Sequence, residues 1–220
     1  MSRHACAALA SHTMPAVTPT LPHRHSLNTY RNKLMLSIKD IRDSHKLCEL
    51  LGYFDVEIGD HIVEDWYAIN EIAAFDSFGG EGAGGRYVLL PAGHVLFISS
   101  EGSAGVIANN FVAFLDLVSG CPYWQGILHF SHGGDFDCMT QAEELLRSDP
   151  RNEEDWPSER VAELRGLLGL GVPQRSYAKT LHAVVTNSEG NPNVLAFDGT
   201  PYGNLFGSFK PSDNPNWSAA

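Results

Sequence analysis

The chain has 220 residues, with 43% hydrophobic and 19% charged side chains and a formal net charge of −11 at pH 7. A chain of this length can bury the core of one soluble domain, and no segment approaches the roughly 20 apolar residues of a membrane span. The four cysteines form no CxxC pair, which argues against a disulfide framework or a zinc site. These features argue against a membrane-spanning helix and predict a soluble cytoplasmic protein with reduced thiols.

The charge is unevenly distributed along the sequence. The first 33 residues contain no Asp or Glu, so the rest of the chain carries 11 basic and 26 acidic side chains, a formal charge of −15. Nucleic acid and anionic membranes are poor partners for such a chain, whereas a basic protein is a good one, because opposite charges accelerate association. The simpler interpretation of the charge alone is that it keeps the protein soluble.

Residues 1–30 mix Ser, Thr, Pro and His without a hydrophobic period, which predicts a disordered or loosely attached tail. A single globular domain is expected over residues 31–220. Because Met35 lies at this boundary, the sequence leaves open whether residues 1–34 belong to the native protein.

Two helices are expected at the start of this domain. The first ends at Gly52 and has an apolar stripe at helical spacing, formed by Leu34, Ile38, Ile41, His45 and Cys48. The second is expected over residues 62–75 and faces inward through Ile62, Trp66, Ile69, Ile72 and Ala73. It leads directly into a glycine-rich segment.

The segment from Phe75 to Val118 is the most informative part of the chain. Its glycine-rich acidic turn is followed by apolar runs at residues 86–90 and 94–99, which predict two antiparallel strands. A second turn at Glu101-Gly102 precedes a helix expected from about residue 108 to Gly120, with a stripe formed by Phe111, Phe114, Leu115 and Val118. The predicted order is therefore strand, turn, strand, turn and helix.

This segment resembles the SUKH superfamily, which unites a yeast regulator of cell-wall synthesis with many bacterial immunity proteins. The resemblance lies in glycine, acidic and aromatic positions in a fixed order: Phe78, Gly79, Glu81, Gly82, Gly84, Gly85, Tyr87, Ser100, Glu101, Gly102, Val106, Ala108, Phe111, Phe114 and Leu115. It implies a SUKH-like α+β domain that binds proteins. Bacterial members are implied to neutralise polymorphic toxins, often nucleases, by direct contact, and fungal members resemble interaction scaffolds.

The remainder of the chain predicts a mixture of short elements. Residues 123–130 read as a strand, and Thr140-Gln-Ala-Glu143 reads as a capping box that starts a helix at Gln141. A further helix is expected over Trp156 to Leu168, and residues 181–186 and 194–197 are expected to form a terminal hairpin. The whole predicts one α+β domain with a mostly antiparallel sheet and flanking helices.

Catalytic interpretations of the glycine and serine positions are weak. A phosphate-binding loop needs Lys-Ser/Thr at the start of a helix, whereas Arg86 starts a predicted strand. We expect the glycines to serve the turn and Glu81 to accept its backbone amides. Ser99, Ser100 and Ser103 lack the spacing of a nucleophile elbow, and Glu101 is expected to lie in a turn or near the start of the following helix.

Potential metal ligands cluster at His129, His132, Asp135 and Asp137. Two His and two Asp residues could bind a divalent cation, but the three-residue spacing of the histidines and the glycines between them favour an exposed loop. We therefore expect neither a metal nor another cofactor, and no enzymatic activity.

These observations together predict a non-catalytic protein-binding module, with an immunity protein against a basic toxin as the first hypothesis. An interaction scaffold is the alternative, and a metal-dependent enzyme is the third. The candidate partner surface combines acidic and aromatic residues: Tyr123, Trp124, Glu143, Glu144, Asp149, Glu153, Glu154, Asp155 and Trp156. The aromatic residues are equally compatible with a core, and the acidic run with an ordinary solvated helix and loop.

Overall fold

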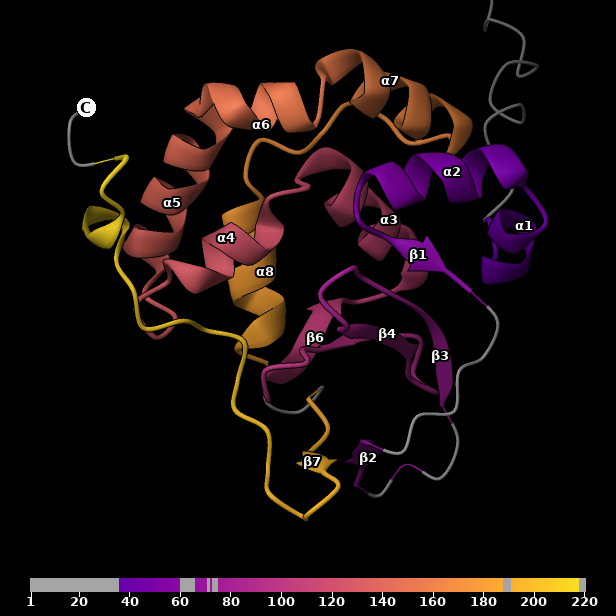
Figure 1. Cartoon of the computed structure of the whole chain (residues 1–220), viewed down its shortest axis with the longest axis vertical. Coiled ribbons are helices and arrows are strands. Elements are labelled where there is room, and N and C mark those ends of the chain that lie inside the picture. The colour runs from indigo at the N-terminus through magenta and orange to yellow at the C-terminus, as the bar shows by residue number, and fades with distance from the viewer. Residues whose placement is uncertain (1–35, 60–65, 71, 73–74, 188–190, 218–220) are drawn as a thin grey trace, which may run out of the picture. The chain divides into compact units, whose positions relative to one another are not determined.

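The computed structural model describes residues 36–59, 66–70, 72, 75–187 and 191–217. Within these residues the chain forms a five-stranded antiparallel sheet of order β1-β3-β4-β5-β6, a two-stranded sheet β2-β7 and eight α-helices (Figure 1). All of them belong to one compact unit that begins at Met35. The α+β prediction, with a mostly antiparallel sheet and flanking helices, is confirmed. The predicted tail over residues 1–30 lies outside the described residues.

Two short helices replace the single helix expected at the start of the domain. These are α1 (Ile38–Arg42) and α2 (His45–Tyr53). The helix is interrupted between them because the Ser44 hydroxyl accepts a hydrogen bond from the Leu47 amide and so caps a new helix. Gly52 lies inside α2 rather than ending it. The left-handed backbone after the helix occurs at Asp55, with φ of 58°.

The central sheet contains the predicted strand pair and three further strands. β4 (Arg86–Leu89) pairs with β5 (Val95–Ile98) so that Tyr87 lies opposite Phe97, which confirms the predicted pair. The edge strands are β1 (Glu57–Ile58) and β6 (Ala104–Ala108), and β3 (Asp76–Gly80) lies between β1 and β4. Neither β3 nor β6 was predicted. β3 includes two of the glycines assigned to the turn, and β6 lies between the second turn and the helix.

Alternate residues of the sheet enter two separate apolar cores. Tyr87, Val95 and Phe97 join the core under the helices, whereas Val88 and Leu96 join the core under β2 and β7. This alternation follows from the two-residue period of a strand. Figure 1 shows the corresponding layers, with the helices on one side of the five-stranded sheet and β2-β7 on the other.

The second sheet contradicts two predictions. β2 (Tyr67–Ile69) lies where a helix over residues 62–75 was expected, and it pairs with β7 (Val194–Ala196). Tyr67 and Ile69 are buried while Ala68 is exposed, so the described part of this segment follows the strand period rather than the helical one. Ile62 and Ala73 lie outside the described residues. The expected hairpin is also wrong, because residues 181–185 lie in α8 (Tyr177–Val185).

The remaining helices include one confirmed prediction and two corrections. α3 (Phe111–Gly120) forms as expected. Residues 124–129 form α4 (Trp124–His129) instead of a strand, since this short apolar run fits either element and packs here as a helix. α5 (Phe136–Ser148) begins before the predicted capping box: Asp135 caps it, and the Thr140 hydroxyl donates to the Phe136 carbonyl.

The helical layer is completed by α6 (Pro150–Asp155) and α7 (Ser158–Leu167). The predicted helix over Trp156 to Leu168 is confirmed over most of its length, although Trp156 ends α6 and α7 begins two residues later. A short 3-10 turn, Pro211–Asp213, lies near the end of the described chain. Among the described helices, the longest has 13 residues, and none is both long and apolar enough to cross a membrane.

Candidate partner-binding site

The aromatic residues of the SUKH-like motif form one cluster in the interior. The Phe78 ring of β3 lies 5.3 Å from Phe111 and 5.5 Å from Phe114 of α3, in edge-on contacts. The Tyr87 ring lies 4.8 Å from Phe114, and Leu115 is buried beside them. These motif positions therefore join the sheet to α3.

The glycine-rich turn is organised by Glu81, as the sequence predicted. One carboxylate oxygen accepts the Gly85 amide at 2.9 Å and the other accepts the Ala83 amide at 3.2 Å. Gly84 has a φ of 98°, which favours glycine, and the Gly82 amide donates to Asp55 at 2.9 Å. The turn is therefore held both by its own carboxylate and by Asp55, which follows α2.

The second turn lies against the first. The Ser100 hydroxyl donates to the Ala83 carbonyl at 3.0 Å, and the Glu101 amide donates to the Ser99 hydroxyl at 3.0 Å. Gly102 has a φ of 87°. Glu101 is exposed in this turn and does not start α3, because β6 intervenes and the Asn110 side chain caps the helix by accepting the Ala113 amide.

A cavity of about 480 Å³ opens between these two turns, α4 and the segment 204–207; we call it the turn pocket. Its apolar wall includes Phe97, Trp124 and Leu128, and both Glu81 and Glu101 line it. The residues that line it include neither Lys nor Arg. No pattern in the sequence indicated that residues 204–207 would form a wall, because they have no hydrophobic period and meet the turns only after folding.

The aromatic candidates of the partner surface have different environments. Trp124 is buried, and its ring makes an edge-on contact with Phe97 at 5.2 Å, so it is part of the core and of the turn pocket. Tyr123 is half-buried, and burial raises its pKa to about 12. Trp156 is half-buried where α6 ends. Tyr123 and Trp156 thus each keep some exposed surface.

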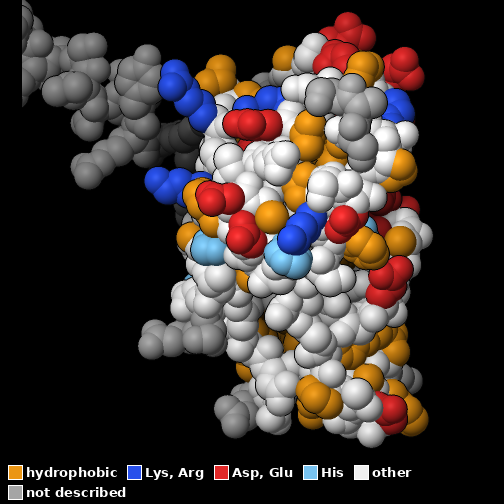
Figure 2. Space-filling model, turned by 90° about the vertical axis from the view of Figure 1, so that its left-hand side faces the viewer, with side chains coloured by type: hydrophobic (Ala, Val, Ile, Leu, Met, Phe, Trp, Pro, Cys, Tyr) orange, Lys and Arg blue, Asp and Glu red, His pale blue; other side chains and the backbone are white. Residues whose placement is uncertain are grey.

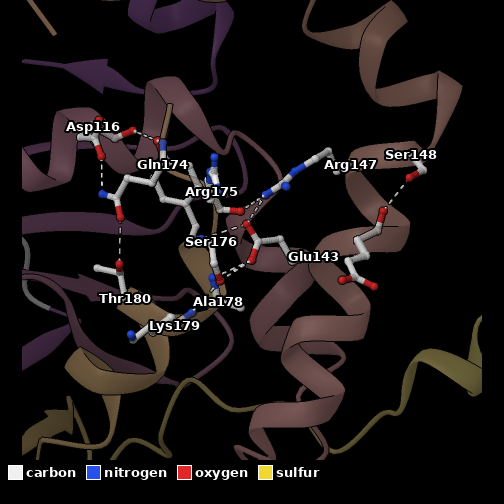
Figure 3. Close-up of polar contacts among 12 residues, drawn as sticks. Asp116, Glu143, Arg147, Ser148, Gln174, Arg175, Ser176, Ala178, Lys179 and Thr180 are labelled. Atoms are coloured by element: carbon white, nitrogen blue, oxygen red, sulfur yellow. Dashed lines mark hydrogen bonds and ion pairs between the residues drawn. The ribbon is translucent and has the colours of Figure 1, made fainter. Parts of the chain in front are cut away.

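Glu143 differs from the other acidic candidates because it is buried. One carboxylate oxygen accepts the Tyr177 amide at 2.8 Å, and the other accepts the Ala178 amide and the Ser176 hydroxyl, each at 3.0 Å. Figure 3 shows the contacts of Glu143 with Ser176 and Ala178 together with its ion pair to Arg147. Glu143 therefore holds the start of α8 against α5 and presents no free charge to a partner.

The remaining acidic candidates lie along the outer edge of the helical layer. Asp149 caps α6, and its hydrogen bond from Arg151 lowers its pKa to about 2. The other candidates and one further carboxylate are exposed, and we call them the acidic edge: Glu144, Glu153, Glu154, Asp155 and Glu159. Figure 2 shows acidic side chains at the upper end of its face, the end at which α6 and α7 lie in Figure 1.

The segment from His129 to Asp137 was predicted as a loop, but His129 is the last residue of α4 and Asp137 lies in α5. Its contacts are mostly structural. The His129 ring stacks on Phe209 at 4.8 Å, and Nδ1 of His132 lies 3.2 Å from the Ser208 carbonyl oxygen. Asp135 accepts the Cys138 amide at 2.9 Å, and this contact lowers its pKa. In the part of the chain that the structure describes, no three His, Cys, Asp or Glu side chains are grouped closely enough to hold a metal ion.

No family model, curated protein or solved structure matches this chain. The resemblance to the SUKH superfamily therefore depends on the sequence motif. The candidate site is defined by the geometry of the acidic edge and of the turn pocket.

Proposed function

We propose that this chain is a non-catalytic protein-binding module that neutralises a basic toxin domain by direct contact, in the manner of the SUKH immunity proteins that its motif resembles. The observation that supports the proposal most directly is the acidic edge, which sets exposed carboxylates along the consecutive helices α5, α6 and α7. A toxin that binds phosphate groups, such as a nuclease, has a surface of the opposite charge.

Most of the charge on this edge is available to a partner. Glu144, Glu154, Asp155 and Glu159 are exposed, and none of them forms an ion pair with another described residue. Glu153 accepts the Ser158 amide at 3.0 Å, which connects α6 to α7. An approaching cationic surface would therefore pair with these carboxylates without first breaking internal ion pairs.

The edge is supported by buried contacts that limit its motion. Glu143 holds α5 to α8, and Arg165 of α7 pairs with Asp116 of α3 at 2.7 Å while only 3% exposed. Helices fixed in this way need little ordering on binding, which favours affinity. Half-buried Trp156, between α6 and α7, is the aromatic residue best placed to contribute apolar contact beside the charges.

Affinity capture of the tagged protein from its own cells, washed in low and in high salt, tests the proposal. We expect one stoichiometric basic protein that is retained in low salt and weakened in high salt. Several substoichiometric partners that are insensitive to salt would instead indicate a scaffold. A purified activity that is lost in His132→Ala would contradict the non-catalytic assignment.

The captured partner then allows the edge to be tested with matched variants. The combined variant Glu153→Gln, Glu154→Gln, Asp155→Asn should slow association by about tenfold at low salt, because charges at an interface mainly set the association rate. The control is Glu49→Gln, Glu57→Gln, Asp137→Asn, which removes the same charge from exposed positions elsewhere. Equal effects of the two variants would show that only the net charge matters and would reject the acidic edge as the interface.

A further inference from the structure

The turn pocket has the dimensions and the composition of a binding site. Its volume of about 480 Å³ falls within the range of roughly 300 to 1,000 Å³ that ligand-binding cavities occupy. Two of its walls come from turns that are held in place by hydrogen bonds. The Ser100 hydroxyl donates to the Ala83 carbonyl, and the Gly85 amide donates to the Glu81 carboxylate. The pocket therefore has preformed walls on the side where its charged residues lie.

The two carboxylates that line the pocket favour a cation, and the basic side chain that lines it is that of His129. Glu81 is 9% exposed, and its carboxylate meets two backbone amides but no cationic side chain among the described residues. A carboxylate has about four acceptor sites, so Glu81 keeps acceptor capacity towards the pocket. Glu101 is exposed at the rim, and its carboxylate makes no hydrogen bond or ion pair within the described chain.

The apolar wall favours one kind of cation over others. Half-buried Phe206 supplies aromatic surface and half-buried Leu205 supplies aliphatic surface, while Phe97, Trp124 and Leu128 also line the pocket but are at most 5% exposed. An arginine side chain combines an alkyl stem, which such surface covers, with a planar guanidinium group that stacks on aromatic rings and donates to carboxylates. A lysine ammonium is more strongly hydrated and loses more on entering such a cavity.

We propose that the turn pocket receives the side chain of an arginine residue of the basic partner protein, with Glu81 and Glu101 accepting hydrogen bonds from the guanidinium group. The inference rests on the proposed function for the source of the arginine. The acidic edge attracts a basic surface without selecting one side chain. The turn pocket would add a contact that is specific for arginine.

Nuclear magnetic resonance titration of the full chain tests the pocket without the partner. N-acetyl-arginine amide is the probe, and the neutral isostere N-acetyl-citrulline amide is its control. We expect saturable shifts of backbone amides that line the pocket, including those of Ala83, Ser100, Glu101 and Gln125, with arginine amide only. Equal shifts with both compounds, or shifts confined to the acidic edge, would overturn the proposal.

Variants at exposed positions of the pocket sharpen the test. Glu101→Gln should weaken binding of arginine amide by about fivefold, as for a partly exposed ion pair, whereas Glu49→Gln on α2 should leave it unchanged. Ala83→Trp should block the mouth of the pocket and abolish binding. The spectrum of each variant shows whether it is folded. Unchanged binding in Ala83→Trp would reject the pocket.

The two proposals can fail separately. If the captured basic partner binds the wild type and Ala83→Trp equally well, the arginine contact is wrong and the proposed function stands. If arginine amide binds in the pocket but cells yield no basic partner, the pocket stands and the proposed function is wrong.

Discussion

The sheet half and the helical half of this protein are held together by different interactions. In the sheet half, Phe78, Tyr87 and Phe114 connect the strands to α3 through apolar and aromatic contact. In the helical half, Glu143 connects α5 to α8, and Arg165 connects α7 to α3. Apolar contact depends on shape and volume, whereas a buried charge depends on specific partners. The two halves should therefore respond differently to conservative substitution.

The Arg165 contacts show that a buried charge in the helical half depends on several specific hydrogen-bond partners. Its guanidinium group donates to the Asp116 carboxylate at 2.7 Å, to the Ser119 hydroxyl at 3.1 Å and to the Gly171 carbonyl at 2.8 Å. The Tyr177 hydroxyl donates to the Asp116 backbone carbonyl at 3.2 Å. These residues come from α3, α7, α8 and the connection before α8, so a buried network around Arg165 and Asp116 links three helices.

The largest expected loss of stability tests the sheet half. Phe78→Ala removes a fully buried ring from the centre of the cluster and should lower the free energy of unfolding by about 4 kcal/mol. Urea unfolding followed by circular dichroism measures it. Phe197→Ala is the control, since Phe197 is 86% exposed and its loss should change stability by less than about 0.5 kcal/mol. Similar losses in both variants would show that the cluster is not the core of this half.

The next effect tests the helical half. Glu143→Gln keeps the size of the side chain but removes its charge, so Arg147 and the start of α8 lose their carboxylate. We expect a loss of about 2 kcal/mol in the free energy of unfolding, allowing for the partial exposure of Arg147. Glu144→Gln makes the same chemical change at the exposed neighbouring position and should be nearly neutral. If the two variants were equally stable, packing rather than charge would hold α8.

A smaller effect is expected where the two halves meet, at the start of α3. Asn110→Ala removes the side chain that accepts the Ala113 amide at 2.8 Å and should cost about 1 kcal/mol of stability. Asn109→Ala changes the adjacent exposed residue, whose side chain makes no hydrogen bond within the described chain. Thermal unfolding of both variants distinguishes loss of the cap from a general effect of alanine.

The smallest effect depends on pH and concerns Asp149. Its hydrogen bond from Arg151 lowers its pKa from 3.8 to about 2 in the folded protein. A carboxyl group with a lowered pKa in the folded state stabilises the protein at pH values above its pKa in the unfolded state. This contribution disappears as the pH falls towards the pKa in the folded state. The stability difference between wild type and Asp149→Asn should therefore shrink between about pH 5 and pH 2. If the difference in the free energy of unfolding stayed constant over this pH range, the ion pair with Arg151 would be excluded as its cause.

The sequence predicted those elements whose determinants are local. β4 and β5 are continuous apolar runs between turns, and α3 has a helical stripe with a glycine and a proline near its end. The role of Glu81 was also predictable, because its acceptor groups contact amides only two and four residues away. Each of these signals lies within one short stretch of chain.

Elements whose stability comes from distant partners were predicted wrongly or missed. Gly79 suggested a turn, yet it lies in β3 opposite Ile58 of β1, where the backbone of β1 leaves no room for a Cβ atom. Residues 124–129 fit a strand or a helix by their composition, and their packing against α5 and α8 decides for the helix. β2 exists because β7, far along the chain, supplies its partner.

The candidate site likewise combines features that were predictable from the sequence with features that depend on tertiary contacts. The exposed acidic residues near α6 were predicted from composition, because runs of charge are usually solvated. Glu143 looked like one of them, but its partners Tyr177 and Ala178 lie 34 and 35 residues later, and only folding brings them to it. The turn pocket likewise joins the two turns to α4 and to the segment 204–207.

The sequence by itself determined the α+β class, the central strand pair with α3, and the excess of acidic charge, because hydrophobic period, turn glycines and composition are properties of the chain alone. The tertiary structure decided which carboxylates are buried and which are exposed, and that the motif turns line a cavity. Those outcomes depend on desolvation and on partners from distant segments, and neither has a local signature in the sequence.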